Sequence, residues 1–126
     1  MTDIPSISRA IALAAAEAAR DKQASDVVVL DVAELLSITD YFVICSTTSN
    51  RQSKTVIEAV EERVRHELEL RPVRREGEGD AGWWLLDYVD VVVHVFGEEQ
   101  RAYYDLERLW SDAPRPAWAA AARSAG

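Results

Sequence analysis

Hydrophobic residues recur at helical spacing in two parts of this chain. The first set has members three and four positions apart, which predicts an amphipathic helix over residues 6–22. Its members are Ile4, Ile7, Ile11, Ala14 and Ala18. A second helix is expected to begin after Ser49 and to stop at Pro72, because a hydroxyl three residues before Gln52 suits a helix start and proline ends a helix. Its inner stripe is formed by Val56, Ile57, Val60, Val64 and Leu68.

Short hydrophobic runs bounded by polar residues predict strands. The runs with this pattern are Asp26–Val32, Tyr41–Ser46, Val73–Glu76, Trp83–Asp87 and Asp90–Phe96. The last two are expected to form a hairpin with Tyr88 and Val89 at its tip, because the Asp87 carboxylate can accept backbone N–H bonds there. The final run is apolar on both alternations, which predicts a central strand covered on both faces. The segment Leu35–Ile38 is expected to form a turn that packs over the sheet.

The end of the chain is expected to hold one more helix and then a tail. Gly97 precedes this helix, whose stripe consists of Tyr103, Leu106 and Trp110. After it, two prolines and many small residues lack a capped periodic pattern, which predicts a flexible tail. The chain contains no internal repeat, so we expect a single domain followed by this tail.

The composition is that of one soluble globular domain. The 126 residues are 48% hydrophobic and 29% charged, and no apolar run approaches the ~20 residues that a membrane-spanning helix needs. Asp3, Arg9 and Glu17 give the N-terminal segment a charge pattern unlike that of a signal peptide. Cys45 is the single cysteine, which forbids an internal disulfide and fits a reducing compartment. We therefore expect a cytoplasmic protein.

The charge balance favours a basic partner over nucleic acid. The chain has 22 acidic and 14 basic residues, a formal charge of −8. Affinity for nucleic acid usually depends on Lys and Arg side chains that displace counterions from phosphates, so we expect little or no direct binding to nucleic acid. A basic protein is the better electrostatic complement.

Three glycines have the spacing of a dinucleotide-binding loop. Gly77, Gly79 and Gly82 form GxGxxG, but such a loop follows a strand and opens a helix, whereas this one opens a strand. Glu78 and Asp80 within it would also repel phosphate. We therefore interpret the segment as a flexible connection before the hairpin.

The helix start in the segment Ser46–Arg51 (STTSNR) is a better candidate for binding an anion. Hydroxyls and free N–H groups at a helix start, with Arg51 nearby, suit a phosphate group. Helix capping explains the same residues without a ligand. The alternative function that follows from this segment is a nucleotide-binding or nucleotidyltransferase-like enzyme.

Isolated polar residues do not assemble into a further site. Asp87 and Asp90 are three apart and flank a turn, whereas two acids on one strand face are two apart, so no metal site is expected. His94 lies in the most apolar strand and is interpreted as a structural histidine, while His66 lies on a charged helix face. Cys45 is interpreted as a buried, inert thiol. No catalytic residue and no cofactor are expected.

The aromatic residues near the hairpin are a candidate docking surface. Trp83 and Trp84 are adjacent on a strand and must point to opposite faces, so both belong to the core only if the sheet is covered on both sides there. If one ring is uncovered, the hairpin presents aromatic anchors beside acids, which suits a basic protein. Both alternatives stay open from the sequence pattern.

Four segments in this order resemble the ribosomal silencing factor (RsfS, or Iojap) family. They are DVVVLDV, SITDYFVICSTTSNRQ, GWWLLDYVDVVVHVF and EEQRAYYDLERLW. The likeness covers about residues 5–112, so we expect the domain to occupy residues 1–112 and the tail residues 113–126. The resemblance implies a single α/β (α+β) domain, with a mixed β-sheet flanked by helices and a nucleotidyltransferase-like topology that lacks the catalytic acids. The sequence agrees, since Asp87 and Asp90 are not spaced to hold two metal ions on one triphosphate.

The resemblance also implies a translation repressor and not an enzyme. Family members bind the large ribosomal subunit through ribosomal protein L-fourteen and sterically block joining of the small subunit, which lowers protein synthesis in starvation or stationary phase. The family also forms homodimers, so a homodimer is expected when the protein is free. The partner-binding residues carried over by position are Trp83, Leu85, Leu86, Asp87, Tyr88 and Asp90. Trp84 departs from the family pattern, which leaves open whether Trp83 or Trp84 contacts the partner.

Overall fold

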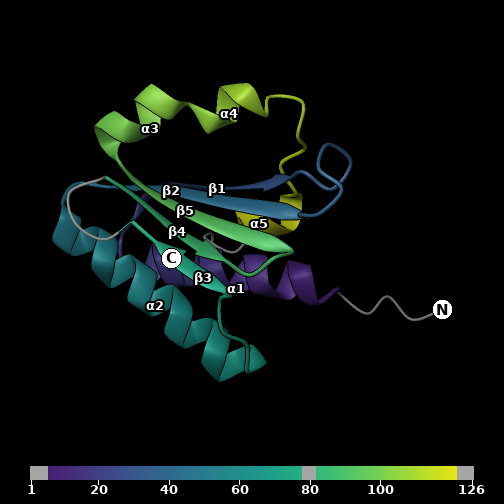
Figure 1. Ribbon diagram of the computed structural model, residues 1–126, viewed down its shortest axis with the longest axis horizontal. Helices are drawn as coiled ribbons and strands as arrows, with labels where there is room; N and C mark the ends of the chain where they lie inside the picture. The colour runs from purple at the N-terminus through teal and green to yellow at the C-terminus, as the bar shows by residue number, and fades with distance from the viewer. Residues whose placement is uncertain (1–5, 78–81, 122–126) are drawn as a thin grey trace.

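The computed structural model describes residues 6–77 and 82–121, which form one sheet with helices on both faces (Figure 1). The sheet has five strands in the order β1-β2-β5-β4-β3. The strands are β1 (Ser25–Asp31), β2 (Tyr41–Thr47), β3 (Arg74–Glu76), β4 (Trp83–Asp87) and β5 (Val91–Gly97). The helices are α1 (Ile7–Asp21), α2 (Asn50–Leu68), α3 (Glu98–Tyr104), α4 (Leu106–Leu109) and α5 (Ala117–Ala121).

The sheet is mixed, as the family resemblance implied. β2 and β5 run parallel at its centre, and the other neighbouring strands pair antiparallel. β4 and β5 form the predicted hairpin, in which Trp83 lies opposite Phe96 and Leu85 lies opposite His94. β5 is a central strand between β2 and β4, which explains why it is apolar on both alternations.

Helices α1 and α2 cover one face of the sheet and form the larger part of the core with it (Figure 1). Both helices begin at serine caps, of which only Ser49 was predicted. Ser6 Oγ accepts from the backbone N–H of Arg9, and Ser49 Oγ accepts from that of Gln52. The predicted inner stripe of α2 is confirmed except that Leu68 is half-buried. Ile7 is exposed, so the prediction that it faces the core was wrong.

The other face is covered by α3, α4 and the segment that follows them, and here the prediction of one continuous helix was wrong. Asp105 has a left-handed backbone (φ 46°) and separates α3 from α4. This break changes which residues face the sheet. Leu106 and Trp110 pack against it as expected, whereas Tyr103 is 81% exposed.

The segment after Asp112 contains structure that the sequence did not predict. α5 packs on the same side of the sheet as α1, where Ala119 is buried and the Trp118 ring meets the Tyr41 ring edge-on. The Pro114 carbonyl accepts a hydrogen bond of 2.8 Å from the backbone N–H of Asp31, at the open edge of β1. Residues 113–121 are therefore folded onto the domain, and residues 122–126 lie outside the described residues.

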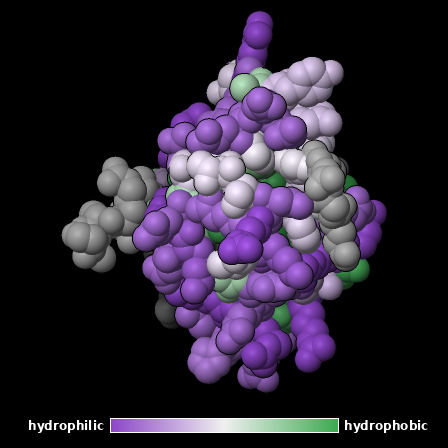
Figure 2. All heavy atoms as spheres, turned by 90° about the vertical axis from the view of Figure 1, so that its left-hand side faces the viewer, coloured by the Kyte–Doolittle hydropathy of each residue, from purple (hydrophilic) through white to green (hydrophobic). Residues whose placement is uncertain are grey.

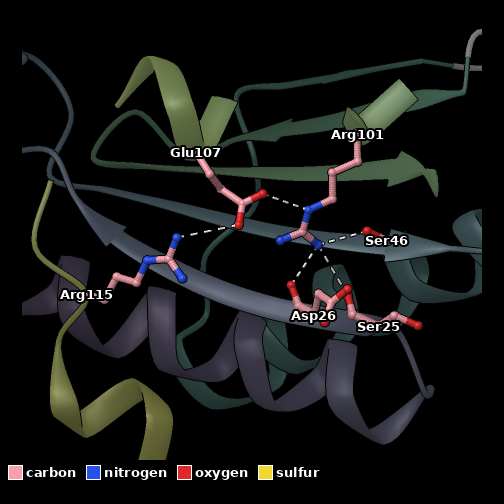
Figure 3. Close-up of polar contacts among 6 residues, drawn as sticks. All are labelled: Ser25, Asp26, Ser46, Arg101, Glu107 and Arg115. Atoms are coloured by element: carbon pink, nitrogen blue, oxygen red, sulfur yellow. Dashed lines mark hydrogen bonds and ion pairs between the residues drawn. The ribbon is translucent and has the colours of Figure 1, made fainter. Parts of the chain in front are cut away.

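Arg101 of α3 ties the second layer to the edge of the sheet (Figure 3). The β1–β2 pairing is interrupted by a bulge at Asp26, which has a positive φ of 50°. One guanidinium nitrogen of Arg101 donates to the Asp26 carbonyl at 2.7 Å and to Ser46 Oγ at 2.8 Å, while Nε donates to the Glu107 carboxylate at 2.9 Å. Arg101 therefore supplies a donor where the strand ladder is interrupted, and it holds α3 and α4 in place.

The β4–β5 turn contains a strained residue. Val89 has a φ of 72°, which a β-branched side chain rarely adopts. The Asp90 N–H bonds back to the Tyr88 carbonyl two residues earlier, and the Val89 N–H donates to Asp87 Oδ1 at 2.7 Å. The Thr39 hydroxyl donates to the Val89 carbonyl. The surrounding hydrogen bonds therefore hold Val89 in a costly conformation.

Replacing Val89 with glycine is expected to stabilise the protein. Glycine adopts a left-handed backbone without the Cβ clash, so Val89→Gly should raise the free energy of unfolding by about 1 kcal/mol. Urea unfolding with an unchanged m-value measures this gain. Val89→Ala is the control, because alanine keeps the Cβ and should gain much less. If the glycine variant is no more stable than the alanine variant, the positive φ of Val89 does not destabilise the protein as proposed.

The Glu107 ion pair predicts a defined dependence of stability on pH. The hydrogen bond from Arg101 is the main cause that holds the pKa of Glu107 below its ordinary value, and the charges of Arg101 and Arg115 act in the same direction. When folding lowers the pKa of a carboxyl group, the ionised carboxylate stabilises the folded protein at pH values above the pKa of the unfolded state. This stabilisation is lost as the pH falls through the pKa of the folded state. Glu107→Gln should therefore cost about 1 kcal/mol at pH 7 and progressively less below about pH 4, measured by urea unfolding across pH. A cost that does not change with pH would contradict this role.

Candidate functional site

The alternation of β4 divides the predicted partner-binding residues between two faces of the sheet. Trp84 and Leu86 point toward α1 and α2 and are buried. Trp83, Leu85 and Asp87 lie on the opposite face and are half-buried. We call this row of three residues the β4 open face. The sequence left open which tryptophan is uncovered, and the structure shows that it is Trp83.

Leu86 and Tyr88 do not lie at the surface, although both were predicted to bind a partner. Leu86 is fully enclosed and Tyr88 is 7% exposed, in the core formed with α1 and α2. Burial raises the pKa of the Tyr88 hydroxyl, and the nearby charge of Glu61 adds to this effect. Strand alternation places them beside Trp84, facing the core of the isolated chain, and their role in binding a partner stays a prediction.

Trp84 is a core residue held by polar contacts at its edge. It is 3% exposed, and its Nε1 donates to the side-chain oxygen of Asn50 at the start of α2, at 3.3 Å. The Arg75 guanidinium lies 5.4 Å from the ring centre and forms an ion pair of 2.7 Å with Glu61. These contacts join β4 to α2 and leave Trp84 no surface for docking in the isolated chain.

Trp83 has a different environment, made of aromatic rings from β5 and α3. Its ring centre lies 4.9 Å from that of Phe96 and 4.5 Å from that of Tyr104. Its Nε1 donates to His94 Nδ1 at 3.1 Å. Sequence analysis missed Tyr104, which lies beside Trp83 at the rim of the β4 open face. The adjacent tyrosines were the available signal, but the periodicity of an unbroken helix directed attention to Tyr103.

Asp87 and Asp90 flank the turn as predicted. Asp87 Oδ1 accepts from the Val89 N–H, and Oδ2 accepts from an Arg74 guanidinium nitrogen at 3.1 Å on the neighbouring strand. Asp90 is exposed. Within residues 6–77 and 82–121, no three His, Cys, Asp or Glu side chains are grouped so that they could hold a metal ion. Arg74 therefore neutralises Asp87, and Asp90 is the exposed acid at the turn beside the β4 open face.

At the alternative anion site at the start of α2, several donors are already in use. The Thr48 N–H donates to Gln52 Oε1 at 2.9 Å, and the hydroxyls of Thr47 and Ser53 bond to each other. The adjoining hollow, of about 380 Å³, is also bordered by Glu98 and Glu99. An anion in this hollow would meet the carboxylates of Glu98 and Glu99. The helix start is therefore explained by capping and packing.

The glycines before the hairpin have backbone roles. Gly77 and Gly82 have positive φ values of 111° and 72°, and Gly79 lies outside the described residues. A Cβ on Gly77 would lie 2.3 Å from the Trp83 carbonyl oxygen. Glycine is required at position 77 because the chain passes against the start of β4. The segment indeed opens a strand and not a helix.

Cys45 is enclosed in the core, as the sequence predicted. Burial raises the pKa of its thiol to about 12, which keeps it protonated near neutral pH.

None of the described helices is long and apolar enough to span a membrane. Figure 2 shows the side of the molecule on which α2 and α3 lie, and this side is largely hydrophilic with small, separate hydrophobic spots.

Comparisons with known proteins identify related chains. A family model described as "Ribosomal silencing factor during starvation" matches residues 5–125, so the match extends beyond residue 112, where the resemblance was expected to end. The ribosomal silencing factor RsfS of Bacillus subtilis (strain 168) is 40% identical over 100 residues, which cover 79% of this chain and 84% of that protein. A crystal structure of a Chromobacterium violaceum protein has a TM-score of 0.77 and 33% sequence identity, covering 86% of this chain and 89% of that one.

One further relative is an organellar protein. The mouse protein named "Mitochondrial assembly of ribosomal large subunit protein 1" is 34% identical over 95 residues. The matched part is 73% of this chain and 41% of the mouse protein. The relatives named here are bacterial and mitochondrial proteins whose similarity to this chain includes the hairpin-bearing domain.

The two adjacent tryptophans are expected to differ in their effect on stability. Trp84→Ala removes an enclosed ring and should lower the free energy of unfolding by about 3–5 kcal/mol. Trp83→Ala removes a partly exposed ring and should cost roughly 1–2 kcal/mol. Urea unfolding of both variants measures the difference, with Tyr103→Ala as an exposed aromatic control. Equal losses for Trp83→Ala and Trp84→Ala would contradict this division of the strand into a core face and an open face.

Proposed function

This chain belongs to the ribosomal silencing factor family, and from that premise we propose that it lowers protein synthesis by binding the large ribosomal subunit and blocking joining of the small subunit. The family name describes silencing of ribosomes, a regulatory and non-enzymatic role. The mouse relative's name refers to the large ribosomal subunit, which supports the choice of subunit. Repression in starvation or stationary phase is the expected setting, and the cytoplasm is the expected location.

The single observation that best supports a docking role is the β4 open face. A partly exposed tryptophan stands in a row with Leu85 and Asp87 on a strand whose other face is buried. Aromatic anchors surrounded by polar groups often contribute most of the binding energy at protein interfaces. A strand at this position is also held rigidly by β5 and α2, so little ordering is needed on binding.

The charge of the protein supports a basic partner. Asp87 and Asp90 lie at one end of the β4 open face, and the chain has a formal charge of −8. Such a surface complements a protein rich in Lys and Arg and favours fast association at low ionic strength. The proposed partner is ribosomal protein L-fourteen of the large subunit, the protein that the family resemblance implies.

The proposed mechanism is steric. A folded domain of this size, bound where the small subunit must approach, prevents joining as long as it stays bound. The extent of repression therefore depends on occupancy, which is set by the concentration and affinity of the protein and not by turnover. The exposed part of Trp83 also offers a surface for self-association, so we propose a homodimer for the free protein. Subunit binding and dimerisation would compete if both use this face.

Substitutions on the open face test the docking proposal. Trp83→Ala and Leu85→Ala should each weaken binding to purified large subunits, and Trp83→Ala should weaken it by about 2 kcal/mol or more if the ring is an anchor. Co-sedimentation with large subunits measures affinity, and a subunit-joining assay measures the block.

Arg51→Ala is the matched control, because Arg51 is exposed at the start of α2, the helix that packs on the opposite face of the sheet from the β4 open face. It should leave both measurements unchanged. Unchanged binding by the folded Trp83→Ala and Leu85→Ala variants would overturn the proposed docking surface. Loss of binding in Arg51→Ala would instead favour the start of α2 as the functional site.

A further inference from the structure

His94 of β5 is a buried polar residue beneath the proposed docking surface. It is 5% exposed and lies opposite Leu85 in the hairpin. The Phe42 ring meets its imidazole edge-on at 4.9 Å between centres, and the Phe96 ring is parallel to it at 6.0 Å. Packing alone would favour an apolar side chain at this position, because burying an imidazole removes it from water.

The hydrogen bond to Trp83 fixes the protonation of this histidine. His94 Nδ1 accepts from Trp83 Nε1 at 3.1 Å, so the proton of the neutral ring is on Nε2. Nε2 is also buried, and it has no hydrogen-bond partner within residues 6–77 and 82–121. Leaving a buried donor unpaired costs stability. The fold therefore tolerates an unpaired donor at Nε2 of His94, while Nδ1 on the other side of the ring accepts the hydrogen bond from Trp83.

Trp83 needs such a contact if its orientation matters. Its neighbours Phe96 and Tyr104 contribute tilted ring contacts, with interplanar angles of 32° and 46°. Contacts between rings allow sliding and tilting, whereas a hydrogen bond to one atom favours one direction. Burial lowers the pKa of His94 to about 4, so Nδ1 remains an acceptor at neutral pH.

We propose that His94 is a positioning residue for docking, and that its Nδ1 holds the partly exposed Trp83 indole in the orientation that the partner meets. This inference rests on the proposed function, because it assumes that the β4 open face binds the large subunit. A side chain fixed before binding loses less conformational freedom when the complex forms. His94 itself does not touch the partner, since it lies below Trp83 and is enclosed.

Two variants of similar shape separate positioning from packing. His94→Asn can place an oxygen acceptor where Nδ1 stands, since both atoms follow Cγ, whereas His94→Leu offers no acceptor. His94→Leu should be at least as stable as the wild type, because it removes the unpaired buried donor, yet bind large subunits about five- to tenfold more weakly. His94→Asn should be less stable than His94→Leu but bind within about twofold of the wild type. Urea unfolding and titrated co-sedimentation give the two measurements.

A double-mutant cycle tests whether His94 acts through the indole N–H. Trp83→Phe keeps an aromatic ring but removes the donor, so adding His94→Leu to it should change affinity little. An additional loss as large as that in the wild-type background would show that His94 acts by another route and would overturn the proposal. The Trp83 indole N–H signal in NMR spectra of the free protein, assigned by its disappearance in Trp83→Phe, should shift in His94→Leu and remain near its position in His94→Asn.

The outcomes distinguish this inference from the docking proposal. Full-strength binding by folded Trp83→Ala overturns the docking proposal, and the positioning role with it. Weakened binding by Trp83→Ala together with equal binding by His94→Leu and His94→Asn overturns only the role of His94. If the less stable His94→Asn variant binds large subunits more weakly than His94→Leu, binding follows stability. His94 would then have only a structural role, and the inference would be rejected.

Discussion

The alternation of side chains along β4 is the constraint on which the rest of the structure depends. Each residue of this strand faces either the α1–α2 layer or the side where α3 and α4 leave part of the sheet uncovered. Trp84 and Leu86 anchor the strand in the core, and this anchoring is what makes Trp83 and Leu85 available on the other side. A shift of β4 by one residue would exchange the two sets, so the pairing with β5 also determines which surface the protein presents.

Supporting contacts for this surface come from distant parts of the chain. α3 brings Tyr104 against Trp83, and Arg101 of the same helix is fastened to the bulge in β1 and to Ser46 of β2 (Figure 3). The rim of the open face is thereby connected to the far edge of the sheet. A surface composed of a strand and a helix supported in this way can bind without large rearrangement, which agrees with a mechanism based on occupancy.

Much of this organisation could be predicted from the sequence, because it follows from local patterns. The hairpin, the Ser49 cap, the stripe of α2 and the turn role of Asp87 each depend on a few neighbouring residues. The family resemblance added the mixed topology, which a pattern of strands does not specify. The face of Trp83 could not be decided locally, because it depends on how far α3 and α4 extend over β4. The break at Asp105 was also missed, since aspartate tolerates a left-handed backbone without any signal in the hydrophobic periodicity.

The fold of the last described segment has a consequence for the edge of the sheet. The Pro114 carbonyl accepts a hydrogen bond from the Asp31 N–H on the outer edge of β1, and the neighbouring Ala113 is buried. Exposed strand edges are templates for pairing with other chains, and natural proteins cover them to avoid aggregation. A chain cut after Asp112, at the boundary that the sequence suggested, would lose this cover as well as α5. Its tendency to associate would then reflect an uncovered strand edge and would not test the proposed homodimer.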